Sequence, residues 1–263
     1  MDINTYLKRI NYNGRLDLSI ETIRELQLAH LLSIPFENLS IHLNEPIVLD
    51  YELLFDKIVL RKLGGFCYEL NGLFGYLLNR LGFDVTILSA SVASSEKGFG
   101  PEFDHMTLMV ALEKKWLVDV GFGDSFREPL LIETREPQVQ VNREYLIKEV
   151  DNQLVLYQRE NGGNWKSQYR FTTQSRKLEN FVWMCNYHQT SPESHFTQKR
   201  LCTIAKPFGR LTLSDMCLIE TKDGRRQERD IKNDSEYIAV LENVFGIKIT
   251  NYKTATRVKY QQE

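Results

Sequence analysis

Apolar residues recur at helical spacing through the first third of the chain. Over residues 20–33 they are three or four positions apart, and the pattern stops at Pro35, because proline cannot continue a helix. A second stretch of this kind covers residues 51–60, and a third covers 67–82, where a glycine supplies the C-terminal stop. The pattern predicts a helical unit over residues 1–85.

Beyond residue 85 the helical spacing gives way to short runs rich in Val, Ile, Leu and Thr, which are typical of β-strands. Residues 89–104 are polar and contain two glycines and a proline, so we predict a mobile surface loop there. The expected strands are Val85–Leu88, Met106–Leu112, Trp116–Val120, Tyr145–Lys148, Leu154–Gln158 and Gln168–Thr172.

The end of the chain combines both patterns. Strand-like runs at 211–220 and 225–231 flank Lys222-Asp223-Gly224, a hairpin signal, and a helix capped by Asn233 or Asp234 follows. The sequence therefore predicts an α+β protein in three parts, with boundaries at 1–85, 86–200 and 201–263.

Composition and charge exclude several classes of partner. With 33 basic and 35 acidic residues the formal charge is −2, which gives no field to attract nucleic acid or an anionic membrane. The first thirty residues lack the apolar core of a signal peptide, and no apolar run approaches the ~18 residues of a membrane span. The four cysteines form no C-x-x-C pair, which argues against a disulfide framework or a zinc site. We expect a cytoplasmic protein with no metal.

One cysteine stands where a loop enters the third predicted helix, in the segment Gly64-Gly65-Phe66-Cys67. Free amides and the helix dipole at such a position stabilise a thiolate and can lower a cysteine pKa from ~8.5 to between ~3.5 and ~7.5. The glycine pair would also let other backbone or a substrate approach the sulfur. The alternative is a small buried cysteine that packs the start of the helix.

A nucleophilic thiol needs a base and a group that orients the base. His105 opens one predicted strand, and Asp119 is the only charge in the next, so the two project from one face if the connecting loop has an odd number of residues. They lie opposite each other if the turn centres near Leu112. A turn centred on Lys114 would offset them by about 13 Å. Taken singly, they also fit a loop-end histidine and a carboxylate that caps backbone amides.

Other chemical sites find less support. His188 and His195 bracket a Ser-Pro turn, too loosely spaced for a recognisable zinc motif. Neither a P-loop nor a Rossmann glycine motif occurs, so nucleotide and dinucleotide sites are unsupported.

The candidate residues lie in segments that together resemble the arylamine N-acetyltransferases, and the similarity spans nearly the whole chain. The matching segments are Ile34-Pro35-Phe36-Glu37-Asn38-Leu39, Gly64-Gly65-Phe66-Cys67 followed by Glu69 and Asn71, His105-Met106, Val118-Asp119-Val120-Gly121-Phe122-Gly123 and Tyr169-Arg170-Phe171.

The resemblance implies a three-part fold that resembles cysteine proteases: a helical bundle, a β-barrel and an α/β lid. It also implies that Cys67 takes an acetyl group from acetyl-CoA as a thioester and passes it to an arylamine, arylhydrazine or arylhydroxylamine nitrogen. His105 would be the base and Asp119 its orienter, and the kinetics would be ping-pong.

Binding residues follow from the same resemblance. Phe36, Phe66, Phe122 and Tyr187 would supply apolar walls for an aromatic amine, although core packing explains them equally well. CoA would lie near Gly123 and Tyr187.

The sequence departs from the family pattern at Leu63, where an arginine usually precedes the glycine pair and pairs with the carboxylate here at Glu37. We expect Glu37 and Glu69 to pair with Arg61 or Lys62 instead, so that the helices near the nucleophile are held together less tightly. The interval from His105 to Asp119 is also one residue shorter than is usual in the family.

Three alternatives remain open at this point. A macrocycle-closing amide synthase or a Cys-His-Asp amidase would use the same triad on another substrate. A protein that only binds a ligand would keep the pocket but have an unreactive Cys67.

Overall fold

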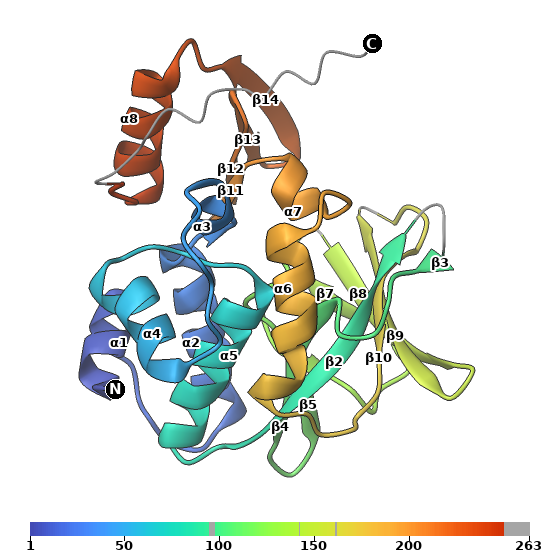
Figure 1. The fold of residues 1–263 in the computed structure, drawn as a ribbon. Helices are drawn as coiled ribbons and strands as arrows, with labels where there is room; N and C mark the ends of the chain where they lie inside the picture. The colour runs from blue at the N-terminus through green and yellow to red at the C-terminus, as the bar shows by residue number, and fades with distance from the viewer. Residues whose placement is uncertain (95–97, 142, 161, 250–263) are drawn as a thin grey trace.

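The structure is a computed structural model that describes residues 1–94, 98–141, 143–160 and 162–249. The last part of the expected 201–263 unit and the middle of the expected 89–104 loop lie outside the described residues. The chain forms a helical part, a large curved antiparallel sheet and a C-terminal α/β unit (Figure 1). The expected α+β class in three parts is confirmed. No helix in the described ranges is long and apolar enough to cross a membrane.

Two long helices, α2 (Ile20–Ser33) and α5 (Cys67–Arg80), form the centre of the helical part, as the apolar spacing predicts. The Ser19 side chain accepts the Thr22 N–H and caps the start of α2. Nearly every side chain of α5 is buried, which fits its long apolar pattern. The smaller helices around them are α1 (Ile3–Arg9), α3 (Leu39–His42) and α4 (Tyr51–Phe55).

The helix expected over residues 51–60 is present but changes its winding. After α4 the chain continues as one π-helical turn, η1 (Asp56–Leu60). A π turn shifts the side chains that follow it to a different face of the helix, and such turns often occur at functional sites. Lys57 lies within this turn.

The central sheet has the strand order β6-β5-β4-β2-β10-β9-β8-β7, and a short β3 pairs with β2. All the expected strands occur within it. Its strands are β2 (Asp84–Ser94), β3 (Gly98–Phe99), β4 (His105–Ala111), β5 (Lys115–Val118), β6 (Leu130–Leu131), β7 (Gln138–Gln140), β8 (Arg143–Val150), β9 (Gln153–Glu160) and β10 (Lys166–Phe171).

One loop expectation in this sheet is wrong over its first part. Residues 89–94 continue β2, because Ala90 pairs with both His105 of β4 and Phe171 of β10, so the backbone polar groups are satisfied on both sides. Ser89 and Ser91 are buried there despite their polarity. The composition of the segment suggested a loop, whereas its two neighbouring strands make it a strand.

The C-terminal unit contains β11 (Leu201–Lys206), β12 (Gly209–Ser214), β13 (Cys217–Lys222), β14 (Arg225–Asp230) and α8 (Asp234–Phe245). The single strand expected over 211–220 is wrong, because the chain reverses between Ser214 and Cys217, which pair with each other. The second hairpin lies at the expected turn. The expected cap of α8 is Asn233, whose side chain accepts the Glu236 N–H.

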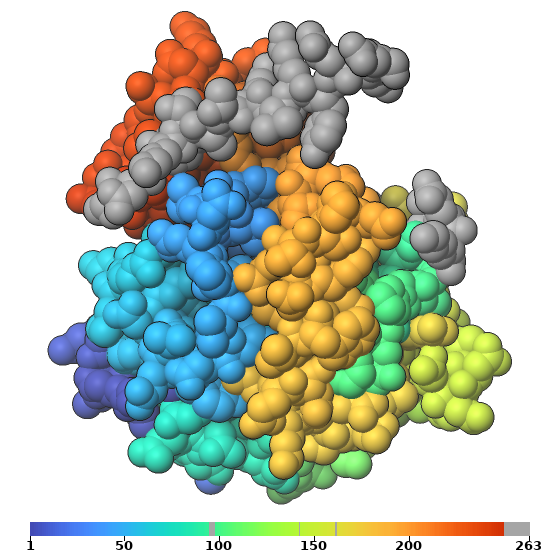
Figure 2. Space-filling view, in the orientation of Figure 1, coloured from blue at the N-terminus to red at the C-terminus, as the bar shows by residue number. Residues whose placement is uncertain are grey.

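Two segments join the three parts. The short β1 (Phe36–Glu37), from the helical part, pairs antiparallel with β11 and so extends the C-terminal sheet. The segment η2 (Leu178–Phe181), α6 (Val182–Thr190) and α7 (His195–Gln198) was not expected from the sequence. Its buried side chains join the helical core, and the segment lies between the helical part and the strands (Figures 1 and 2). The start of α5 therefore lies near the meeting point of all three parts.

Candidate active site

Cys67 is the first residue of α5, and its side chain is buried. Phe66 precedes it in extended conformation, and the Glu69 carboxylate accepts the Phe66 N–H at 3.1 Å. The glycine pair serves close backbone approach: a Cβ at Gly64 would lie 2.1 Å from the Pro35 carbonyl oxygen. The expected position at a helix N-terminus is confirmed.

The hairpin of β4 and β5 brings His105 and Asp119 together. Leu108 pairs with Val118, so the turn is centred on Glu113, between the two turn centres considered from the sequence. The three-residue loop keeps both side chains on one face, and His105 lies two positions from the residue opposite Asp119, as a diagonal neighbour. The His105 Nε2 atom is 2.7 Å from Asp119 Oδ2, and both side chains are buried.

Four hydrogen-bond donors surround the Asp119 carboxylate. Asn71 Nδ2 and the Gly121 N–H bind Oδ1 at 2.8 and 2.9 Å, while His105 and the Tyr169 hydroxyl bind Oδ2 at 2.7 and 3.1 Å. Burial acts to raise the pKa of Asp119, but the interaction with His105 and the hydrogen bonds hold the pKa below its ordinary value. An ionised Asp119 fixes the proton of neutral His105 on Nε2. The Nδ1 atom is therefore the basic nitrogen.

Asn71 links the helix that begins at Cys67 to the segments of His105 and Asp119 by hydrogen bonds. It lies one turn after Cys67, and its side-chain amide donates to Met106 O at 2.6 Å and to Asp119. Its oxygen accepts the Val120 N–H at 2.9 Å. A Cβ at Gly121 would lie 2.8 Å from Cys67 Cα, so only glycine allows this approach. The structure thus brings Cys67, His105 and Asp119 to one place.

The surroundings of the thiol do not favour a free thiolate. Burial raises the pKa of Cys67 well above its ordinary value, the Met106 N–H acts against this, and the charges of Asp104 and Asp119 raise it further. This direction is opposite to the effect expected from the helix N-terminus alone. Loss of the thiol proton therefore requires an acceptor at the site, and His105 is the candidate that the sequence indicates.

The expected substrate-wall residues lie in two groups of aromatic side chains, Phe122 beside His105 and the other three around Phe196 and His188. The Phe122 ring centre is 5.0 Å from that of His105. Phe66 and Phe36 pack against Phe196 of α7, with ring centres 5.5 and 6.2 Å away. The sequence did not single out Phe196 for this role, because it belongs to a segment without a strong periodic pattern.

The two expected CoA contacts lie in different surroundings. Gly123 has a left-handed φ of 83°, and a Cβ there would meet the Phe36 ring at 3.8 Å and Thr203 of β11 at 4.0 Å. Tyr187 lies on α6, is 36% exposed and packs against His188 at 5.5 Å between ring centres. Gly123 thus lies at the boundary with the C-terminal unit, whereas Tyr187 lies on the surface of the joining segment.

A pocket of about 330 Å³ lies where the central sheet meets the C-terminal unit. Its arginines come from three separate strands and loops, so no local sequence pattern marks them as a group. Two of them face carboxylates: Arg143 lies 2.7 Å from Asp124 and 2.9 Å from Glu160, and Arg210 lies 3.1 Å from Asp124, while Arg127 donates to the backbone carbonyls of Pro207 and Gly209. The charged residues lining the pocket are Asp124, Arg127, Arg143, Glu160, Arg210 and Asp223.

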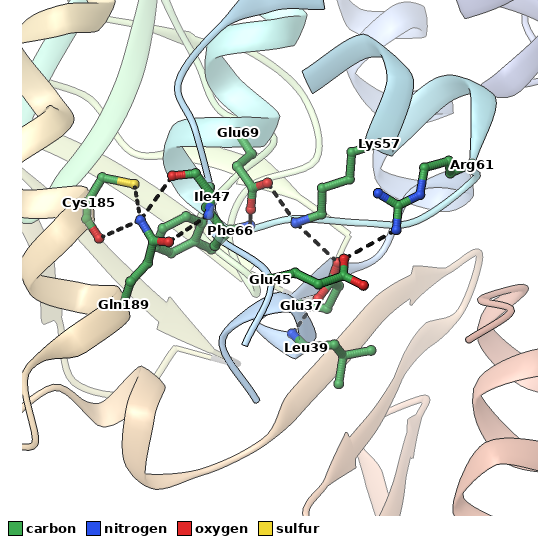
Figure 3. A network of polar contacts seen from close by, with 10 residues as sticks. All are labelled: Glu37, Leu39, Glu45, Ile47, Lys57, Arg61, Phe66, Glu69, Cys185 and Gln189. Atoms are coloured by element: carbon green, nitrogen blue, oxygen red, sulfur yellow. Dashed lines mark hydrogen bonds and ion pairs between the residues drawn. The ribbon is translucent and has the colours of Figure 1, made fainter. Parts of the chain in front are cut away.

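The buried carboxylates near the nucleophile have a different partner from the one expected (Figure 3). Lys57 Nζ lies 2.6 Å from Glu69 Oε1 and 3.8 Å from Glu37 Oε1. The expectation that Arg61 or Lys62 pairs with Glu37 and Glu69 is therefore wrong, because Lys57 is the partner of both. Lys57 lies in the π turn of η1 with its side chain only 12% exposed, and helical periodicity gave no sign of this burial.

Within the residues that the structure describes, no group of three or more His, Cys, Asp or Glu side chains could hold a metal ion. The chemistry available at the site is that of a thiol, an imidazole and a carboxylate in a largely buried setting. This set is suited to nucleophilic transfer of an acyl group.

Comparisons with known proteins agree with this chemistry. A family model described as N-acetyltransferase matches residues 19–254. The arylamine N-acetyltransferase of Escherichia coli K12 is 32% identical, over 95% of this chain and 90% of the relative. Proansamycin X synthase of Amycolatopsis mediterranei is 33% identical, over 93% of this chain and 97% of the relative.

Solved structures show the same fold. The arylamine N-acetyltransferase of Mycobacterium marinum in complex with CoA superposes with a TM-score of 0.86 at 32% identity, covering 94% of this chain and 93% of the other. The match in sequence, in fold and in the segments that carry the site shows that the chain belongs to the arylamine N-acetyltransferase family.

Proposed function

We propose that the protein is an acetyl-CoA-dependent arylamine N-acetyltransferase that works through a thioester on Cys67. The observation that carries the proposal is the buried His105–Asp119 pair, which Asn71 fastens to the helix that begins at Cys67. The family membership and the CoA complex of a relative support acetyl-CoA as the donor. The acceptors are small arylamines, arylhydrazines or arylhydroxylamines.

In the first half of the reaction the acetyl group moves to the enzyme. His105 Nδ1 takes the Cys67 proton, and the thiolate attacks the thioester carbonyl of acetyl-CoA. The bond from the carbonyl carbon to the CoA sulfur breaks, and the CoA thiolate leaves with the proton from His105. Backbone N–H groups in the first turn of α5 are the natural donors to the oxyanion.

In the second half the acetyl group moves to the acceptor. The amine nitrogen attacks the acetyl carbon on Cys67, and His105 Nδ1 takes a proton from that nitrogen. The carbon–sulfur bond to Cys67 breaks, and His105 returns the proton to the departing thiolate, which restores the starting state. Because both substrates use the same sulfur in turn, the kinetics are ping-pong.

The surroundings of Cys67 suit an aromatic acceptor. Phe122 beside His105, and Phe36 and Phe66 around Phe196, supply apolar faces against which a flat ring can pack. The C-terminal unit, whose β11 pairs with the strand of Phe36, acts as the lid of the site. CoA enters beside Gly123, with Tyr187 as a further contact, and the reaction takes place in the cytoplasm.

The test compares wild type with Cys67→Ala. We expect acetyl-CoA to add one acetyl group to the wild type, detected by intact mass, and an arylamine panel to discharge it. Cys67→Ala should remain folded, form no adduct and have no turnover. A folded wild type that forms no acetyl adduct would overturn the proposal.

A second function has one specific observation in its favour: the similarity to proansamycin X synthase, a relative that is not named for arylamines. An amide synthase would use the same triad with a tethered acyl chain. It would leave acetyl-CoA untouched and release an internal amide from a long acyl thioester that carries an aromatic amine. The two functions are therefore separated by which acyl donor labels Cys67.

A further inference from the structure

Lys57 is a buried cation that the catalytic proposal does not use. Only 12% of its side chain is exposed, and it points toward two carboxylates, Glu37 and Glu69, whose side chains are 2% and 0% exposed. Moving a lysine out of water is unfavourable unless partners compensate, and here the two carboxylates compensate its charge. Figure 3 shows Lys57 between the two carboxylates.

The partners of Lys57 lie on the two segments that position the reacting groups. Glu69 is in the first turn of α5, two residues after Cys67, and its other oxygen accepts the Phe66 N–H at 3.1 Å. Glu37 is in β1, where its carboxylate accepts the Leu39 N–H and its own N–H donates to Gly65 O at 2.9 Å. One ammonium group therefore connects η1 with the start of the nucleophile helix and with the strand beside it.

The charge count of this cluster also makes Lys57 indispensable. Two carboxylates and one ammonium leave a net charge of −1 among the three side chains. Burial and Glu37 raise the pKa of Glu69, and Lys57 acts against that rise. Without the ammonium, two like charges would face each other in the interior, two residues from the nucleophile.

We propose that Lys57 is a positioning residue for Cys67, acting through Glu69 on the first turn of α5 and through Glu37 on the strand of Phe36. If the Glu69 oxygen that pairs with Lys57 rotates out of place, the other oxygen loses its hydrogen bond to the Phe66 N–H. Phe66 immediately precedes Cys67, the first residue of α5. The chain thereby fixes the nucleophile with a lysine from a π turn rather than with a residue next to the glycine pair. The activity assay below rests on the proposed function, whereas the thiol assay does not.

The experiment compares Lys57→Met, Lys57→Arg and the control Lys248→Met in the full chain. Lys248 pairs with Glu242 at 3.0 Å but is exposed, so its loss should leave the site unchanged. For Lys57→Met we expect kcat to fall about tenfold or more with KM for the acceptor within about twofold, because misplacement of the sulfur slows the chemistry rather than binding. Lys57→Arg keeps the cation and should recover most of kcat.

The second readout is the rate at which iodoacetamide alkylates Cys67, followed by peptide mass at several pH values. Lys57→Met should slow alkylation near neutrality and move its midpoint to higher pH, because the unpaired carboxylates oppose a thiolate. If Lys57→Met does not fold, Lys57→Met with Glu69→Gln removes one charge of each sign and should fold, still with a kcat at least about tenfold low.

A folded Lys57 variant with wild-type kcat and a wild-type alkylation profile would overturn the inference. So would a Lys57→Arg variant as impaired as Lys57→Met. Loss of the acetyl adduct in the wild type, with the alkylation difference intact, would instead refute the proposed function and leave the positioning role standing.

Discussion

Two buried acidic centres of the molecule satisfy their charge in different ways. Asp119 receives four hydrogen bonds, and within the part of the chain that the structure describes its only ionisable positive partner is His105. Glu37 and Glu69 instead share the permanent cation of Lys57. A lysine beside Asp119 would compete with His105 for the carboxylate. The difference separates a carboxylate that orients a proton carrier from carboxylates that hold elements of the fold together.

The same contrast appears in the direction of the pKa shifts. The pKa of Asp119 is lowered, because its donors and His105 outweigh burial. The pKa of Glu69 is raised, because burial and Glu37 outweigh Lys57. Changes at Asp119 should therefore mainly lower activity, whereas changes at the Lys57 centre should lower stability as well as kcat.

The largest expected effect is that of Asp119→Asn on activity. The amide cannot hold the proton of His105 on Nε2 as a carboxylate does, so kcat should fall by about 10³- to 10⁴-fold. Steady-state kinetics and a melting curve measure both quantities, with Asp234→Asn at the start of α8 as the control. Loss of activity only in proportion to unfolded protein would show that Asp119 is structural.

Glu69→Ala should have the largest effect on stability. It removes the closer partner of Lys57 and the acceptor of the Phe66 N–H, so the free energy of unfolding should fall by about 3–5 kcal/mol. Urea denaturation measures this. Glu242→Ala, which breaks only the exposed pair with Lys248, should cost less than about 1 kcal/mol. Equal losses in the two variants would contradict the assigned role of the cluster.

Tyr169→Phe should act more weakly and on both quantities. It removes one of the four donors to Asp119 and keeps the ring, whose centre lies 5.1 Å from that of His105. We expect a loss of about 1 kcal/mol of stability and less than about tenfold in kcat. Tyr76→Phe, in the helical part, is the matched control. A loss of kcat as large as that of Asp119→Asn would mean that the hydroxyl takes part in the reaction.

The pH dependence of stability should carry opposite signs at the two centres. Asp119 has a folded pKa below the ordinary 3.8, so its contribution is present above that value and is lost as pH falls through the folded pKa. Glu69 has a folded pKa above the ordinary 4.5, so its contribution is present below that value and is lost as pH rises through the folded pKa.

Melting temperatures measured from about pH 3 to about pH 7 test these signs. Glu69→Gln should remove the fall that the wild type shows as pH rises above 4.5, and Asp119→Asn should remove the fall at the acid end. Curves for Glu69→Gln and wild type that run parallel would show that Glu69 titrates normally.

The smallest effect is expected from Leu63→Arg. An arginine at this position would add a cation near Glu37 and could strengthen a weak contact there. However, Lys57 already pairs with Glu37, and Leu63 packs against the core of the C-terminal unit. The melting temperature and activity should therefore not rise. A clear gain in either would show that Lys57 leaves Glu37 under-compensated.

Local patterns predicted much of this molecule. The bounds of α2, the start of α5 near Cys67 and a cap of α8 at Asn233 or Asp234 followed from apolar spacing and capping residues, which act within a few positions of the chain. The helices over residues 178–198 were not predicted, because they are short and are stabilised by packing into the helical core rather than by a strong apolar pattern of their own.

The sequence predicted which residues are candidates for the site, but it did not predict how they are arranged. Cys67, His105 and Asp119 were chosen for their chemistry and neighbours. The turn at Glu113, which sets His105 and Asp119 two positions apart, depends on which hairpin register packs best across both sheet faces. Tyr169 reaches Asp119 across β2 and β4, and no spacing along the chain encodes that contact.

The sequence by itself thus determined the fold class and the order of the three parts, and it predicted Cys67, His105 and Asp119 as candidates for acyl transfer, because periodicity, caps and reactive side chains are properties of short segments. Tertiary structure decided the hairpin register, the four donors around Asp119, the raised pKa of the Cys67 thiol and the partnership of Lys57 with Glu37 and Glu69. Each of these depends on burial and on contacts between residues far apart in the chain, where packing and desolvation select the partners.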